Sequence, residues 1–120
     1  MCPHLDRTEF GWIEIDGRRY EHDVLIRRDG TVEKRKKKLS KRVYGTSHTI
    51  SRDEAKHVYE KGASTLIVGS GQNDCVRLSD EAAEYFKRHD VEVQLLPTPR
   101  AIDAWNEAPE DSIGLFHVTC

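Results

Sequence analysis

The chain has 120 residues, of which 37% are hydrophobic and 33% are charged, and its formal net charge is −2 at pH 7. This length predicts a single domain with its own hydrophobic core, spanning residues 1–120. The small net charge excludes a general attraction to nucleic acid or to a membrane surface, so such binding would need a local cluster of charge. No apolar run approaches the roughly 20 residues that cross a bilayer, and we expect no association with membranes.

The first residues, MCPHLDRTEF, contain acidic side chains and no apolar core segment, so they do not resemble a secretory signal. We expect residues 1–9 to form an N-terminal tail. The three cysteines, Cys2, Cys75 and Cys120, are odd in number and have no paired spacing. Such usage argues against a disulfide framework and favours a cytoplasmic protein.

The first third of the chain predicts a β-meander. Two Asp-Gly pairs, each typical of a tight turn between antiparallel strands, separate apolar segments that begin at Trp12, Tyr20 and Thr31. Residues 36–50 have neither a helical nor a strand period, and we expect a long, partly ordered connection there.

The remaining chain alternates helix and strand. Ser51 and Glu54 form a capping-box pattern, and Ser79 has the position of a second helix cap. Residues 64–96 predict a strand–helix–strand unit, which should be right-handed and parallel. The sequence thus indicates one layered α/β domain. We expect helices at residues 51–62, 79–89 and 99–106, and strands at 66–68, 91–95 and 113–118.

The segment TLIVGSGQ, residues 65–72, leads from an apolar strand into two glycines. A dinucleotide fingerprint would need a third glycine where Asp74 stands, and a helix directly after it. A Walker loop would need Gly-Lys followed by Ser or Thr. We therefore expect a sharp turn at the carboxyl end of a strand, with a pocket-lining loop as the alternative.

A polar cluster, Ser47-His48-Thr49, precedes the first capped helix, and it could reach over the end of the 65–72 strand. It is interpreted as Ser/Thr turn chemistry or, alternatively, as part of an active site. His117 should point to the same side of its strand as Ile113 and Leu115, as a core histidine would. The candidate pocket residues are Ser47, His48, Gly69, Ser70, Gly71, Gln72 and His117.

We expect no metal site, because the histidine and cysteine spacings lack the two short ligand pairs that are typical of structural zinc sites. No complete catalytic set stands out, and no cofactor motif is present. The sequence therefore predicts neither catalytic residues nor a bound cofactor.

A run of basic residues is the sharpest charge cluster in the chain. It could bind nucleic acid weakly and in a salt-dependent way, but Tyr44 is the only aromatic residue close behind it to stack on bases. The favoured interpretation is a solvated edge strand whose lysines discourage pairing with other chains. The run consists of Lys34, Arg35, Lys36, Lys37, Lys38, Lys41 and Arg42.

Four ordered segments resemble a small family of single-domain proteins of unresolved biochemical function, which includes an adipogenesis-associated domain protein and a mitochondrial complex I assembly factor. The segments are Gly11-Trp12, residues 60–72, residues 84–106 and the final GLFHVTC, and the resemblance covers residues 10–120. It implies a three-layer α/β fold, with a mixed central sheet, helices on one side and a β-hairpin or meander addition on the other. It also implies a last strand antiparallel to its neighbours, whereas helix 99–106 would permit a parallel crossover. The family brings no accepted catalytic residues.

Three functions remain open. The favoured one is a non-enzymatic binding or assembly domain that uses protein partners and a shallow polar pocket at residues 69–72. The first alternative is an enzyme or small-ligand binder that uses Ser47 and His48 with this loop, because open α/β sheets bind ligands at the carboxyl ends of strands. The second is weak nucleic-acid binding through residues 34–42, and homo-oligomerisation is compatible with all three.

Overall fold

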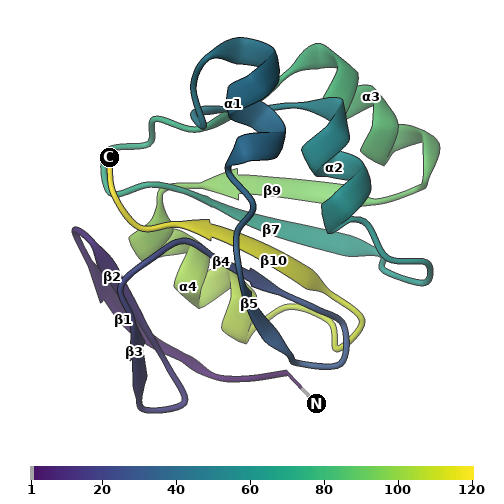
Figure 1. Cartoon of the computed structure of the whole chain (residues 1–120). Coiled ribbons are helices and arrows are strands. Elements are labelled where there is room, and N and C mark those ends of the chain that lie inside the picture. The colour runs from purple at the N-terminus through teal and green to yellow at the C-terminus, as the bar shows by residue number, and fades with distance from the viewer. Residues whose placement is uncertain (1) are drawn as a thin grey trace.

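A computed structural model describes residues 2–120 as a mixed five-stranded sheet covered on both faces (Figure 1). The strand order is β5-β4-β10-β7-β9, with β10 in the centre. β7, β9 and β10 run parallel, while β4 is antiparallel to both β10 and β5. The mixed α/β fold expected from the sequence is confirmed. The strands are β4 (Val24–Ile26), β5 (Val32–Lys34), β7 (Thr65–Ser70), β9 (Glu92–Leu96) and β10 (Ile113–His117).

One face of the sheet carries α1 (Lys38–Tyr44), α2 (Arg52–Val58) and α3 (Asp80–Arg88). Val58 and Phe86 from the helices are buried in one apolar cluster with Leu66, Val68 and Leu115 from the strands. Two short strands on this side, β6 (Thr49–Ile50) and β8 (Arg77–Leu78), pair in parallel. This layer holds the chain segments that flank the candidate site.

The opposite face carries α4 (Thr98–Asn106) beside a meander of β1 (Leu5–Glu9), β2 (Trp12–Ile15) and β3 (Arg18–Tyr20) (Figure 1). The Trp105 ring meets Phe116 edge-on at 6.0 Å, and both rings crowd Gly114, where a Cβ would lie 2.6 Å from Phe116 and 3.0 Å from Trp105. The helices are therefore not confined to one side of the sheet. The apolar stripe of α4 packs in the second core, against the alternate residues of β10 that face away from α2 and α3.

Two expectations about irregular segments were wrong. Residues 5–9 are a strand rather than a tail, because Leu5 is fully buried and its main-chain N–H and C=O are both bound by the Asn106 amide. The connection at residues 36–50 contains α1 and β6. Ser40 is the one buried residue of α1, so this helix is held by polar contacts and shows no hydrophobic period.

The last strand differs from what the resemblance implied. β10 is antiparallel to β4 but parallel to β7, with Leu115 opposite Val68. The crossover through α4 returns the chain to the same end of the sheet, so the carboxyl ends of β7 and β10 lie side by side. Within residues 2–120, no helix has the length and apolar character needed to span a membrane.

Candidate functional site

Arg35 belongs to the basic run in sequence but lies inside the protein. Its side chain is 1% exposed, and it donates to Glu54 from Nε (2.7 Å) and Nη2 (3.0 Å) and to Asp23 from Nη1 (3.0 Å). Nη2 also donates to the main-chain oxygen of Ser47 at 2.7 Å. Burial disfavours the charge of Arg35, but Glu54 and Asp23 outweigh this effect and raise its pKa. Arg35 is therefore an internal ion-pair centre, and the interpretation of the whole run as a solvated surface does not hold for it.

The network continues through α1 and α2. Ser51 caps α2 by accepting the main-chain N–H of Glu54 at 3.1 Å, as the capping-box pattern predicts. In a capping box the Ser51 N–H would also donate to the Glu54 side chain. Here the Glu54 carboxylate accepts from Arg35, and the Ser51 N–H donates to the Ser40 hydroxyl instead. Ser40 also donates to Glu54. These bonds fix the segment between β5 and α2 over the end of the sheet.

Asp23 joins this network to the last strand. It accepts from His117 Nδ1 at 2.7 Å and from the Val118 N–H at 2.9 Å. Burial would raise the pKa of Asp23, but the His117 hydrogen bond, followed by Val118 and Arg35, lowers it to about 2. Asp23 is thus ionised at neutral pH and can only accept hydrogen bonds. In neutral His117, the lone pair then lies on Nε2, 3.1 Å from the Thr119 hydroxyl.

His48, His117 and Cys120 meet beside this carboxylate. The two imidazole rings are 5.2 Å apart and nearly perpendicular, and His48 Nε2 lies 3.3 Å from Cys120 Sγ. Burial, and then the charge of His117, lowers the pKa of His48. A hydrogen bond with Cys75, and then burial, raises the pKa of Cys120. A protonated thiol is a weaker nucleophile than a thiolate, so the raised pKa disfavours the reactive form of Cys120.

The glycine loop after β7 packs against the same cluster. Gly71 has φ +103°, and a Cβ there would lie 2.3 Å from the carbonyl carbon of Cys120 and 2.8 Å from the His117 ring. The amides of Gln72 and Asn73 donate to the main-chain oxygens of Thr119 and Cys120. Because these amides are used within the chain, the loop does not form an anion cradle.

The structure brings some of the predicted pocket residues together and separates others. His48, His117 and Gly71 are adjacent, and the buried Ser47 contributes its carbonyl to Arg35. The other three predicted pocket residues make contacts elsewhere. Ser70 donates to Asp74, the Gln72 amide donates to Thr8, and Gly69 packs beneath Thr98 and Phe116.

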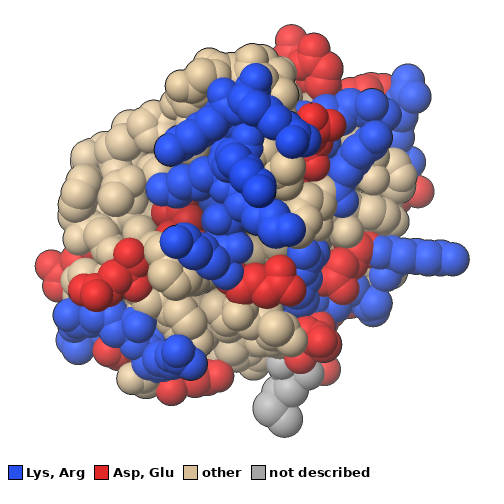
Figure 2. Space-filling model, in the orientation of Figure 1, with Lys and Arg blue, Asp and Glu red and all other residues tan. Residues whose placement is uncertain are grey.

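Asp23 and Arg35 also line a hollow of about 570 Å³. Lys34, Lys36 and Lys38 are exposed at its edge, and Lys37 Nζ lies 3.7 Å from Asp23 Oδ2. Figure 2 shows lysine and arginine side chains gathered over α1 and the segment that joins β5 to it. We call this hollow the basic pocket; its lining residues are Gly11, Glu21, His22, Asp23, Lys34, Arg35, Lys36, Lys37, Lys38, Val118 and Thr119.

Residues 5–112 match the model of a family described as "Protein of unknown function (DUF498/DUF598)". The chain belongs to this family. The match confirms the resemblance seen in the sequence at the level of a family of unknown function. The matched range begins at residue 5 and so includes β1, which the sequence pattern did not reveal.

Several solved structures share the fold of this chain. A conserved hypothetical protein from Pyrococcus horikoshii OT3 is 30% identical, with TM-score 0.90 over 97% of this chain and 98% of its own. A protein named MT938 is 31% identical, with TM-score 0.81 over 98% of this chain and 99% of its own. A Xanthomonas campestris protein solved by NMR shares the fold at 8% identity, with TM-score 0.75 over 98% of this chain and 86% of its own.

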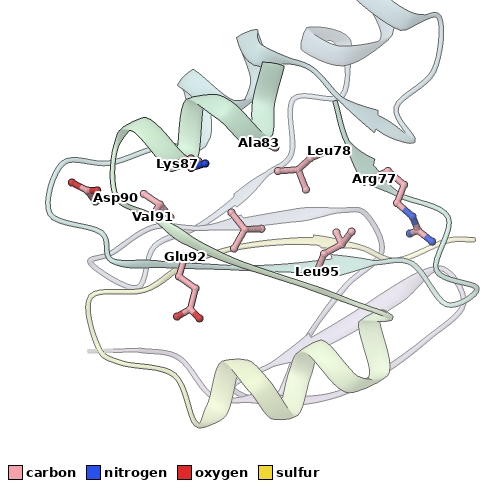
Figure 3. A pocket seen from close by; sticks show the side chains of 9 residues that line it. Arg77, Leu78, Ala83, Lys87, Asp90, Val91, Glu92 and Leu95 are labelled. Atoms are coloured by element: carbon pink, nitrogen blue, oxygen red, sulfur yellow. The ribbon is translucent and has the colours of Figure 1, made fainter. Parts of the chain in front are cut away.

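This DUF498/DUF598 chain also carries an apolar groove of about 610 Å³ that sequence reasoning missed (Figure 3). Leu78, Val93 and Leu95 line it between α3, β8 and β9, and Arg77 and Lys87 lie at its rim. The alternation of Val91, Val93 and Leu95 was visible in the sequence. This alternation could not show that β9 is an edge strand, in which Val93 and Leu95 stay only half-buried.

Proposed function

We propose that this chain is a non-enzymatic binding domain that docks an acidic segment of a protein partner at the basic pocket. One observation carries the proposal: Lys34, Lys36, Lys37 and Lys38 surround a hollow whose floor is fixed by buried ion pairs. The resemblance to a family that includes an assembly factor is consistent with a role in protein binding.

The positive charge of Arg35 in the floor is neutralised internally. Arg35 is paired with both Asp23 and Glu54, so its positive charge is not offered to a ligand. The lysines differ, because no carboxylate within residues 2–120 forms an ion pair with Lys34, Lys36 or Lys38. A carboxylate-rich segment would find these ammonium groups free, and such complementarity gives specificity and a fast association rate.

The rigid floor favours recognition over a flexible charge contact. Asp23 and Arg35 are each 1% exposed at the side chain, and four hydrogen bonds hold the Arg35 guanidinium in place. The adjacent lysine backbones are therefore held at defined positions. A preorganised site loses less conformational entropy when the partner binds.

The alternatives have weaker support. Ser47 is buried, and the raised pKa of the Cys120 thiol disfavours the thiolate that a nucleophile beside His48 would need. Nucleic acid would also be attracted by lysines, but single strands need aromatic platforms, and the hydroxyl of half-exposed Tyr44 is bonded to Glu81.

Fluorescence anisotropy with a labelled oligoglutamate peptide tests the proposal. We expect wild-type binding that weakens as salt rises. The variant Lys34→Gln/Lys36→Gln/Lys38→Gln should bind at least about tenfold more weakly, since three exposed pairs of about 0.5 kcal/mol each would be lost. The matched control Lys61→Gln/Lys87→Gln/Arg100→Gln removes the same charge from exposed positions elsewhere.

Two outcomes contradict the proposal. Equal weakening in both triple variants would mean that only net charge matters. Tighter binding of a single-stranded oligonucleotide than of the peptide, lost in the first triple variant, would assign the surface to nucleic acid instead.

A further inference from the structure

Two imidazoles and one thiol converge from two separate parts of the chain. His48 precedes β6, His117 ends β10, and Cys120 follows it. Each offers one ligand atom, and these three atoms all lie within 4.8 Å of one another, the single such group of histidine, cysteine and acidic residues in the part of the chain that the structure describes. None of these three residues lines the basic pocket, although the pocket residues Asp23 and Thr119 both contact His117.

The orientation of His117 suits a ligand. Its Nδ1 is engaged by Asp23 at 2.7 Å, which leaves Nε2 directed to Thr119 and the cluster. Histidines that bind metals usually donate their second N–H to a carboxylate, which fixes both the tautomer and the ring. Asp23 has this position, and its other oxygen is held by the Val118 N–H at 2.9 Å.

The distances also suit a small ion. Bond lengths of about 2.05 Å for Zn–N and 2.3 Å for Zn–S place neighbouring ligand atoms of a tetrahedral site about 3.6 Å apart. His48 Nε2 and Cys120 Sγ are 3.3 Å apart, and the widest pair would close by roughly 1 Å. His48 and Cys120 are both only half-buried, so an ion could enter from solvent.

We propose that His48, His117 and Cys120 form a binding site for a divalent zinc-type ion. Two imidazoles with one thiolate are a ligand set that suits zinc, and three protein ligands leave a fourth position for water. Binding forms the metal–sulfur bond and releases the Cys120 thiol proton to solvent. The ligand spacing did not predict this site, because only His117 and Cys120 are close in the sequence and His48 lies 69 positions before His117.

The bound ion would tie the segment before β6 to the segment that ends β10, because its ligands come from these two places. The loop after β7 packs on the second of these segments, since the Asn73 amide donates to the main-chain oxygen of Cys120 and Gly71 packs against both Cys120 and His117. This inference does not depend on the proposed acidic partner.

Cobalt binding to the purified full chain, after treatment with a chelator, tests the site. Co²⁺ reports tetrahedral geometry through its visible bands and thiolate ligation through a charge-transfer band in the near ultraviolet. We expect one Co²⁺ per chain, displaced by Zn²⁺, and a rise in unfolding temperature with either ion. Cys120→Ser should remove the charge-transfer band, and His48→Gln should weaken affinity at least about tenfold.

Cys2→Ser and His4→Gln are the matched controls, because they remove a thiol and an exposed imidazole far from the cluster in the fold. Both should bind like the wild type. Absence of the charge-transfer band in the wild type, or its survival in Cys120→Ser with loss in Cys2→Ser, would overturn the assignment. A Cys75–Cys120 disulfide in the freshly purified chain, detected by mass spectrometry, would also overturn it.

Discussion

Replacing Arg35 by methionine should destabilise the fold strongly, although the change lies in a run of residues that resembles a surface. Methionine keeps much of the side-chain volume but leaves Asp23 and Glu54 buried without their cation. Four hydrogen bonds from the guanidinium are lost as well. Removing one partner of a buried ion pair costs about 3–5 kcal/mol. A small domain has only about 5–15 kcal/mol of stability, so this loss is a large part of the total.

Urea unfolding followed by circular dichroism measures the effect. With a slope near 2 kcal/mol per molar urea, a loss of about 4 kcal/mol lowers the midpoint by about 2 M. Lys36→Met is the control, because it changes the next residue at an exposed position and should cost less than about 0.5 kcal/mol. Adding Glu54→Gln to Arg35→Met should cost less than the sum of the two single changes. A loss below about 1 kcal/mol for Arg35→Met would refute the argument that the network is buried and structural.

Three further predictions concern the same end of the sheet. The pKa of Asp23 is about 2 in the folded state against a usual 3.8, so its ionised form stabilises the fold above about pH 4, and this stability is lost as pH falls toward 2. Between these pH values the free energy of unfolding of the wild type should fall by about 2 kcal/mol more than that of Asp23→Asn. An identical acid dependence in the two proteins would contradict this expectation. Gly71→Ala should cost more than Gly45→Ala, since both need positive φ but a Cβ meets Cys120 only at Gly71; equal midpoints in urea would show that the loop moves freely. Ser51→Ala should lower stability by about 1–2 kcal/mol through loss of the α2 cap, and a thermal midpoint equal to that of the wild type would show the cap to be unimportant.

Local signals in the sequence found most of the regular elements. The fully buried strand β7 reads as a continuous apolar run, and the caps at Ser51 and Ser79 both accept the hydrogen bonds expected of them. α1 was missed because it buries only Ser40, so no apolar period marks it. The side of the sheet on which α4 lies depends on which face of β10 its stripe meets, and a single sequence does not contain that information.

The candidate site was predictable only in part. The sequence suggested that His48 and the 65–72 loop would approach each other, and the structure places His48, His117 and Gly71 together. The role of Arg35 was not visible, because its partners Asp23 and Glu54 lie 12 and 19 positions away on other elements. Within a run of basic residues, the one that turns inward is determined by tertiary contacts rather than by composition.

The central claim is that the lysines around the basic pocket bind acidic partners while Arg35 supports the floor. Chemical-shift mapping of the ¹⁵N-labelled chain with oligoglutamate tests it most directly, because each amide reports its own surroundings. We expect shifts to gather at residues 34–38, His22 and Thr119, which line the pocket. Shifts that gather instead along β9 and α3, at the apolar groove, would contradict it.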